Sequence, residues 1–97
     1  MITAIVLIQA QQGRVPELAQ ALLDIREVAE VYSVAGDYDL VAIIRVRRHE
    51  ELAEVVTTKL APITTITRTN TLIAFRAFSN HDLERLFSIG SEEGPGR

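Results

Sequence analysis

The chain has 97 residues, the size of one domain with its own hydrophobic core. It contains no cysteine, which excludes a disulfide framework and a thiolate metal site. A net charge of −3 and a sequence pI of about 5.3 argue against a basic nucleic-acid-binding surface. The N-terminal apolar run, residues 2–8, is too short to span a bilayer and lacks the basic segment of a signal peptide. We therefore expect a soluble, cytoplasmic protein without direct contacts to nucleic acid or membrane.

The N-terminal part of the sequence predicts a strand followed by a helix. Residues 1–9 are mostly β-branched and apolar, which is typical of a strand that is apolar on both faces. Gln11, Gln12 and Gly13 interrupt this run. From Arg14 onward, apolar residues recur at the spacing of one helix face, and this stripe consists of Val15, Leu18, Ala19, Leu22 and Leu23.

Two further strand-like segments, residues 28–35 and 40–46, flank a short polar turn and predict a β-hairpin. Gly36 can adopt the positive φ that a tight reversal requires, and Asp37 tolerates a left-handed conformation. Asp39 places a carboxylate at the start of a buried strand, where an unpaired charge is costly. From the residues alone, we expect Asp39 to bond to the backbone of its own turn.

The second half of the sequence predicts a helix, a strand and a short terminal helix. Residues 50–60 carry a helical apolar stripe, and Pro62 ends the helix. Residues 64–78 are a long, threonine-rich strand. A short helix is expected over residues 79–90, because it opens with a capping-box-like pattern and ends at a glycine. Residues 91–97 are expected to form a disordered tail.

The resulting order, β-α-β-β-α-β, is the ferredoxin-like arrangement of the α+β class. Its usual topology places the first and third strands in the middle of an antiparallel sheet. Those are the two strands with the most continuous apolar content, so the pattern agrees with the topology. The more polar second and fourth strands are then expected at the edges.

One face of this sheet has no partner within a single chain. Two helices can cover one face, and the other face keeps an apolar set from residues 40–46 and from the first strand. Such a face is larger than a soluble monomer normally leaves open, and a second sheet packed about 10 Å away would bury it. We expect a homodimer that forms a closed or nearly closed α/β barrel. A ligand cavity between the sheets is the alternative use of this face.

Two segments resemble signatures of one known family. The run Val34-Ala35-Gly36-Asp37-Tyr38-Asp39-Leu40 is similar to the V-x-G-x-Y-D-hydrophobic signature of the Lrp/AsnC C-terminal effector-binding domain, called the RAM domain. The stretch Ile63 to Thr71 resembles the family's I-x-G-V-x-x-T-x-T, with Thr65 where glycine is usual. The resemblance covers Met1 to Phe78 in element order. Full-length members carry a helix-turn-helix domain before this region, so the chain resembles a stand-alone RAM domain over residues 1–90.

The resemblance implies a non-enzymatic module that dimerises and assembles further into rings or octamer-like particles. It implies that the module binds a small-molecule effector, such as an amino acid or a related metabolite, in clefts between dimers. Full-length Lrp/AsnC regulators are a further partner that the resemblance suggests, which would connect the domain to transcription regulation. No cofactor is implied.

Carried over residue by residue, the resemblance places the ligand-binding cleft at Gly36, Asp37, Tyr38 and Asp39, with Thr69 and Thr71 nearby. A zwitterionic ligand needs a carboxylate for its ammonium group and N–H or hydroxyl donors for its carboxylate. Asp37 or Asp39 can supply the first, and the turn amides with the threonine hydroxyls can supply the second. Each residue also has a structural alternative, which we favour for Gly36 and Asp39 and leave open for Asp37 and Tyr38.

The remaining chemistry in the sequence is sparse. His49 and His81 have no second ligand at metal spacing, and no catalytic motif stands out. The basic run of residues 45–48 is expected to pair with Glu50 and Glu51. The alternative function is a small dimeric α/β-barrel enzyme with oxygenase-like or isomerase-like chemistry in the inter-sheet cavity. That function requires titratable residues inside the barrel, and the central strands are almost entirely aliphatic.

Overall fold

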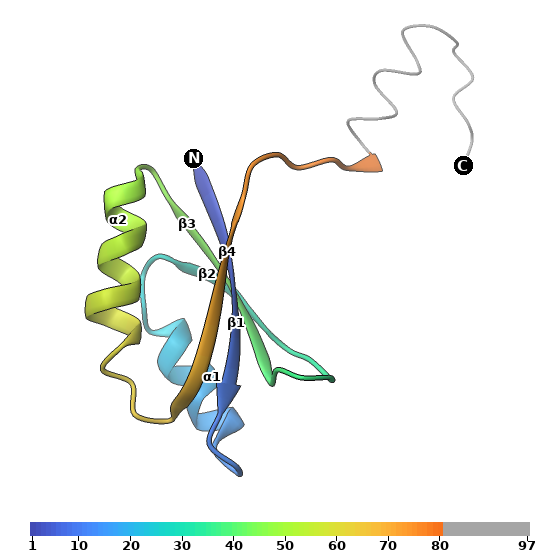
Figure 1. Cartoon of the computed structure of the whole chain (residues 1–97), viewed down its shortest axis with the longest axis vertical. Coiled ribbons are helices and arrows are strands. Elements are labelled where there is room, and N and C mark those ends of the chain that lie inside the picture. The colour runs from blue at the N-terminus through green and yellow to red at the C-terminus, as the bar shows by residue number, and fades with distance from the viewer. Residues whose placement is uncertain (81–97) are drawn as a thin grey trace, which may run out of the picture.

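A computed structural model describes residues 1–80 and contains a four-stranded antiparallel sheet with its helical segments on one face (Figure 1). The predicted βαββαβ order and α+β class are confirmed. The elements in chain order are β1 (Ile2–Ala10), α1 (Val15–Leu23), β2 (Val28–Ser33), β3 (Leu40–Val46), α2 (His49–Glu54), η1 (Val55–Leu60) and β4 (Ile66–Ala74).

The strand order of the sheet is β2-β3-β1-β4, so β1 and β3 lie in the middle and β2 and β4 form the edges, as expected. The register pairs Ile5 of β1 with Ile43 of β3 and with Leu72 of β4. Because directly paired residues of antiparallel strands point to the same face, this register also fixes which side chains share a face. A bulge near Gln9 and Ala10 shifts the β1–β4 register, and the hydroxyl of Thr67 donates to the Gln9 carbonyl there at 3.1 Å.

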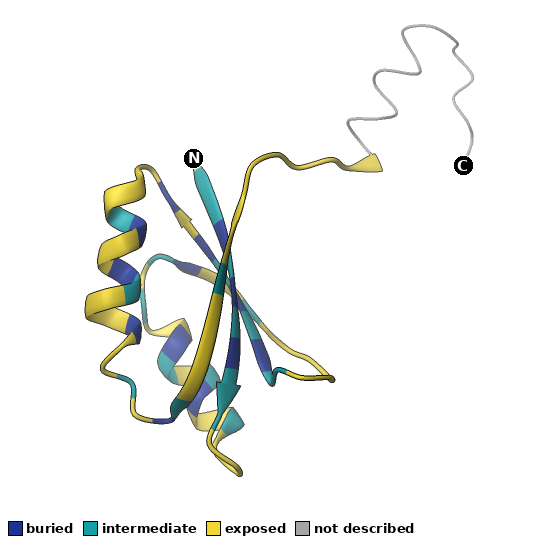
Figure 2. Ribbon diagram, viewed as in Figure 1, coloured by how far each residue is buried: buried dark blue, intermediate teal, exposed yellow. Residues whose placement is uncertain are grey.

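The hydrophobic core lies between the sheet and the helical segments, as the dark-blue residues in Figure 2 show. The two central strands contribute alternate residues that are almost fully buried: Ala4, Val6, Ile8, Leu40, Ala42, Ile44 and Val46. The helical segments contribute Leu18, Leu22, Leu52, Val55 and Leu60. Burying one such aliphatic side chain contributes roughly 1.5–3 kcal/mol, so this layer supplies the main driving force for folding.

The second helical segment changes geometry halfway. The sequence predicts one helix over residues 50–60, and the structure has α2 followed by the wider π-type turns of η1. Residues 55–58 are all β-branched, which lowers α-helix propensity. The hydroxyls of Thr57 and Thr58 also donate to the carbonyls of Ala53 and Glu54, one turn earlier. Such bonds compete with the regular helical ladder and loosen this turn.

The other face of the sheet is open. Four aliphatic side chains of the central strands lie on this face and are only partly buried: Ile5, Leu7, Val41 and Ile43. Leu72 of β4 lies beside them and is 46% exposed. Figure 1 shows α1 and α2 on the same side of the sheet, and no other described element lies over the opposite side. We call the set Ile5, Leu7, Val41, Ile43 and Leu72 the open face.

The ends of two strands differ from the sequence prediction. β2 ends at Ser33 rather than at residue 35, and β4 spans Ile66–Ala74 rather than residues 64–78. Ala74 pairs with Thr3, one residue from the start of β1, and this is the last pair of the β1–β4 register. The chain leaves the sheet there, and Phe75 is 99% exposed.

Thr65 occupies its loop without strain. It is buried, its φ is negative, and its carbonyl accepts the Gln11 N–H at 2.8 Å. The expected helix over residues 79–90, with His81, and the expected tail lie almost entirely outside the described residues. In residues 1–80, no helix is both long and apolar enough to cross a membrane.

Candidate functional site

The turn between β2 and β3 is closed by a hydrogen bond from the Val34 N–H to the Asp39 carbonyl at 3.0 Å. Gly36 has a φ of +122°, a conformation that side-chain-bearing residues rarely adopt. A Cβ at this position would meet no atom within 4 Å, so the requirement for glycine comes from the backbone conformation and not from space. The predicted role of Gly36 in the reversal is confirmed.

Asp39 joins this turn to the neighbouring strand. Its carboxylate Oδ2 accepts the Ala10 N–H at 2.8 Å, and its own N–H donates to the Ile8 carbonyl at 2.9 Å. The expectation that Asp39 bonds to its own turn is therefore wrong for the side chain. The β1 chain passes directly beside the turn, and its last amide is a closer donor. Asp39 thus has a structural task, which is to fix the start of β3 to the end of β1.

Asp37 is placed differently. Its carbonyl accepts a hydrogen bond from the Gln9 side-chain amide at 2.7 Å, which holds this residue against the end of β1. Its carboxylate forms no hydrogen bond or ion pair with residues 1–80. The backbone of Asp37 is therefore fixed while its negative charge is left available.

Tyr38 and Arg68 place a positive charge beside this turn. The guanidinium carbon of Arg68 lies 5.6 Å from the centre of the Tyr38 ring, within the range of a cation–π contact. Among the described residues, no carboxylate pairs with this guanidinium. The two aspartates, Tyr38 and Arg68 thus form one cluster, in which Asp37 and Arg68 carry opposite and unpaired charges.

Sequence reasoning missed Gln9 and Arg68. The two are direct cross-strand partners, on β1 and β4, and both contact the turn. The signal for Arg68 in the sequence was a charged residue flanked by threonines, in a predicted strand that also contains Arg76. Its position beside Tyr38 depends on the bulge and register of the β1–β4 pair, which the sequence pattern does not show.

Thr69 and Thr71 lie on the other side of β4. They pair with Ile8 and Val6, whose side chains enter the core, whereas Arg68 pairs with Gln9 on the opposite face. Thr69 lines a hollow of about 250 Å³ between η1 and β4, whose apolar wall includes Val56, Leu60, Ile63 and Ile66 and whose lining also includes Arg68. Within one protomer, the structure brings Gly36 to Asp39 together but does not bring Thr69 and Thr71 to them.

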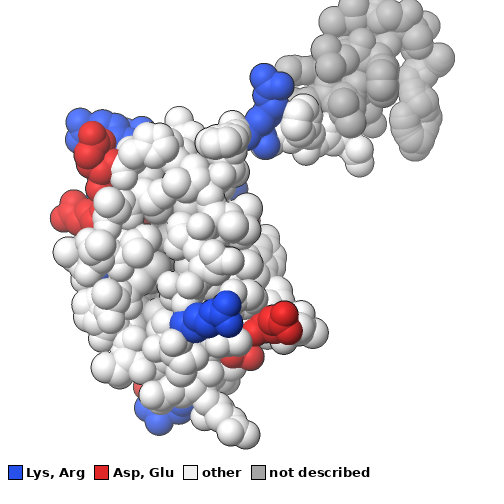
Figure 3. Space-filling model, viewed as in Figure 1, with Lys and Arg blue, Asp and Glu red and all other residues white. Residues whose placement is uncertain are grey.

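Metal-ligating side chains do not gather at one place in the described part of the chain. No group of three or more histidine, aspartate or glutamate side chains in residues 1–80 could hold a metal ion. The open face is aliphatic at its centre, with Arg45, Glu30 and Tyr32 towards one side. Figure 3 shows that charged side chains gather at a few places on the surface in view and that most of it is uncharged.

Comparison with known proteins places the chain in a family. A model of the Lrp/AsnC ligand binding domain matches residues 3–83. The crystal structure of TTHA0845 from Thermus thermophilus is 49% identical, has a TM-score of 0.77, and is matched over 82% of this chain and 100% of that protein. The HTH-type transcriptional regulator FL11 of Pyrococcus furiosus is 43% identical over 51 residues, which are 53% of this chain and 34% of the regulator. The match thus spans about a third of that curated relative.

A more distant structure shares the fold. The transcriptional regulator NMB0573 of Neisseria meningitidis, solved as a complex with L-Met, superimposes with a TM-score of 0.74 at 11% identity over 81% of this chain and 53% of that protein. At this identity the likeness is one of fold alone. The family match covers most of the sequence, residues 3–83 of 97. The chain therefore belongs to the Lrp/AsnC family, and residues 3–83 are its ligand-binding domain.

Proposed function

We propose that the chain is an amino-acid-binding and oligomerisation module, without catalytic activity, built as one domain over residues 1–90. The observation that carries the proposal is the pair of unpaired opposite charges, Asp37 and Arg68, beside a turn that Asp39 and Gln9 hold in place. A rigid loop that presents free charged groups is a common form of small-molecule site. The L-Met complex of NMB0573 supports an amino acid as the class of effector.

The chemistry of the cluster matches a zwitterion. Asp37 can accept hydrogen bonds from an ammonium group, and the planar guanidinium of Arg68 can bind a carboxylate with two parallel hydrogen bonds. Tyr38 holds Arg68 over its ring. Both charges are already present and partly oriented, so ligand binding needs little rearrangement.

The open face supports assembly through a second copy of the chain. Its aliphatic surface is contiguous across β1, β3 and β4, and packing against the same face of another protomer would bury both. The result would be the expected dimeric α/β barrel. Thr69 and Thr71 pair with β1 residues of the core face, whereas Arg68 pairs with Gln9 on the opposite face of β4. Mixed oligomers with full-length regulators would then link ligand binding to transcription.

The test is calorimetric titration of a panel of amino acids into the wild type and into Asp37→Ala, Arg68→Ala and Asp24→Ala. Asp24 is the control, because it is an exposed aspartate at the end of α1, away from the turn. Removing one partner of a charge-assisted hydrogen bond costs about 1.5–3 kcal/mol, so Asp37→Ala and Arg68→Ala should each weaken binding about tenfold or more. Asp24→Ala should have no effect.

An amide derivative of the binding amino acid separates the two contacts. The amide lacks the carboxylate, so its affinity should be insensitive to Arg68→Ala and still sensitive to Asp37→Ala. Sedimentation with and without ligand should show a shift in the association equilibrium, because a ligand that contacts two protomers couples to their assembly. Amino-acid binding that is indifferent to both Asp37 and Arg68 would place the site elsewhere and overturn this assignment.

A further inference from the structure

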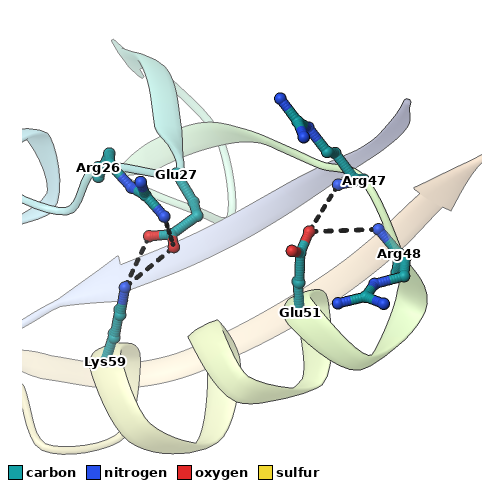
Figure 4. A network of polar contacts seen from close by, with 6 residues as sticks. All are labelled: Arg26, Glu27, Arg47, Arg48, Glu51 and Lys59. Atoms are coloured by element: carbon teal, nitrogen blue, oxygen red, sulfur yellow. Dashed lines mark hydrogen bonds and ion pairs between the residues drawn. The ribbon is translucent and has the colours of Figure 1, made fainter.

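The basic run at the end of β3, residues 45–48, is not neutralised in the way that the sequence suggested. Residues 45–48 were expected to pair with Glu50 and Glu51. In the structure, the Glu51 carboxylate accepts the backbone N–H groups of Arg47 and Arg48, at 2.7 and 3.3 Å (Figure 4). These backbone hydrogen bonds lower the pKa of Glu51 and keep its carboxylate charged, and the bond from the Arg47 N–H has the largest effect. The described residues form no ion pair with the guanidiniums of Arg45, Arg47 and Arg48.

A second acidic residue nearby is also occupied. The Glu27 carboxylate accepts two hydrogen bonds from the Lys59 ammonium group, at 2.9 and 3.0 Å. This contact is the main cause that lowers the Glu27 pKa. Arg26 lies 3.6 Å from the same carboxylate, and its side chain is 90% exposed. Figure 4 shows the Arg47 guanidinium pointing away from Glu51. The arginines therefore keep most of their hydrogen-bonding capacity free.

Three of these arginines line one hollow. It has a volume of about 390 Å³, and Arg26, Arg45 and Arg47 line it together with Met1, Glu27, Val46 and Glu51. The α1–β2 turn supplies Arg26, β3 supplies Arg45, and Arg47 directly follows β3, so the arginines come from separate segments of the chain. Its lining carries three arginines and two carboxylates, and both carboxylates already accept hydrogen bonds, Glu27 from Lys59 and Glu51 from the backbone. The hollow is thus an electropositive concavity in a chain whose net charge is −3.

We propose that this hollow binds a small, multiply charged phosphate compound, with a diphosphate group as the recognised unit. Guanidinium groups match the oxygens of a phosphate with paired hydrogen bonds, and several arginines from different segments suit more than one phosphate. A nucleic acid is a poor fit, because the arginines surround one hollow instead of forming an extended stripe and the whole chain is acidic.

The inference goes beyond the proposed amino-acid site and is spatially separate from it. The hollow adjoins Val46, which pairs with Ile2 at the start of β1, whereas the Asp37 turn adjoins Leu40, which pairs with Ile8. The two sites therefore lie at opposite ends of the β1–β3 pair. A diphosphate at one end and an amino acid at the other would have no contact residue in common.

The experiment is calorimetric titration of inorganic pyrophosphate into the full chain, with inorganic phosphate and sulfate as weaker competitors. The variants are Arg26→Ala, Arg47→Ala and Arg47→Lys, with Arg14→Ala as the matched control. Arg14 is an arginine on another part of the surface, where Glu17 already neutralises it at 2.7 Å. Circular dichroism of each variant checks that it is folded.

We expect saturable binding of one pyrophosphate per protomer, weakened about tenfold or more in Arg26→Ala and Arg47→Ala, because each change removes charge-assisted hydrogen bonds. Arg47→Lys should retain part of the affinity, and Arg14→Ala should be unchanged. The proposal is overturned if no saturable binding occurs, if Arg14→Ala weakens binding as much as Arg47→Ala, or if a short DNA duplex binds this surface more tightly than pyrophosphate. Amino-acid binding measured on the same samples is independent of this result.

Discussion

The two faces of the sheet are built from the same strands and the same residue types, and the helices of the protomer cover only one of them. On β1, Ala4, Val6 and Ile8 are fully buried beneath the helices, while Ile5 and Leu7 between them are only partly covered. β3 repeats this alternation. The difference teaches that a strand apolar on both faces needs two packing surfaces: the helices of the same chain cover one face, and the proposed second copy would cover the other.

The covered face should tolerate a charge least. Ile44 is fully buried, so Ile44→Asp would place an unpaired carboxylate in the core. That costs several kcal/mol, which is comparable to the whole stability of a small domain, roughly 5–15 kcal/mol. We expect loss of the folded state by circular dichroism and of any cooperative thermal transition. A folded Ile44→Asp variant that melts like the wild type would mean that the core is not where the structure places it.

A smaller loss of stability is expected at the start of β3, where Asp39 connects this strand to the end of β1. Asp39→Ala would leave the Ala10 N–H, which is partly buried, without its acceptor. An unsatisfied buried donor costs about 1–3 kcal/mol, so urea denaturation should show a loss of that size. Asp37→Ala is the matched control and should change stability little, because its carboxylate has no partner in the described residues. Equal losses in both variants would remove the distinction between a structural and a ligand-binding aspartate.

The smallest predicted effect concerns the polar link between η1 and the start of β2. The contact with Lys59 lowers the Glu27 pKa below its ordinary value of 4.5. The stabilisation is therefore present above that value and is lost as the pH falls through the lower pKa of the folded state. Glu27→Gln should make the stability less dependent on pH in this acidic window and change it slightly at neutral pH. The measurement is the melting temperature of both proteins between about pH 3 and pH 7, which brackets the ordinary pKa of glutamate. If the melting temperatures of the two proteins change with pH in the same way, the prediction is wrong.

Much of the fold could be predicted because it depends on local patterns. The alternation in the two central strands, the helical stripe of α1 and the glycine at the turn each act within a few residues. Features that depend on distant partners were harder to predict. β4 ends at the last pair of its register with β1, and η1 loosens because threonine hydroxyls bond back to the preceding turn.

The residues of the candidate site also differ in whether a local pattern or a distant partner places them. The Gly36-to-Asp39 turn was visible in the sequence, whereas Arg68 and Gln9 join it through cross-strand register. Thr69 and Thr71 match the family pattern, and yet the pleat of β4 points them to the helix side. The expected pairing of the basic run, residues 45–48, with Glu50 and Glu51 is wrong among the described residues, because Glu51 bonds to the backbone of Arg47 and Arg48 and not to their side chains.

Sedimentation equilibrium of the wild type and of Ile43→Asp tests the central claim, that a second copy covers the open face. Ile43 lies at the centre of that face, and Leu23→Asp on α1, at a side chain that is 50% exposed, is the matched control. We predict a wild-type mass of at least twice 10.8 kDa, the same assembly for Leu23→Asp, and a folded monomer for Ile43→Asp. A monomeric wild type, or an Ile43→Asp variant that assembles like the wild type, would contradict the account.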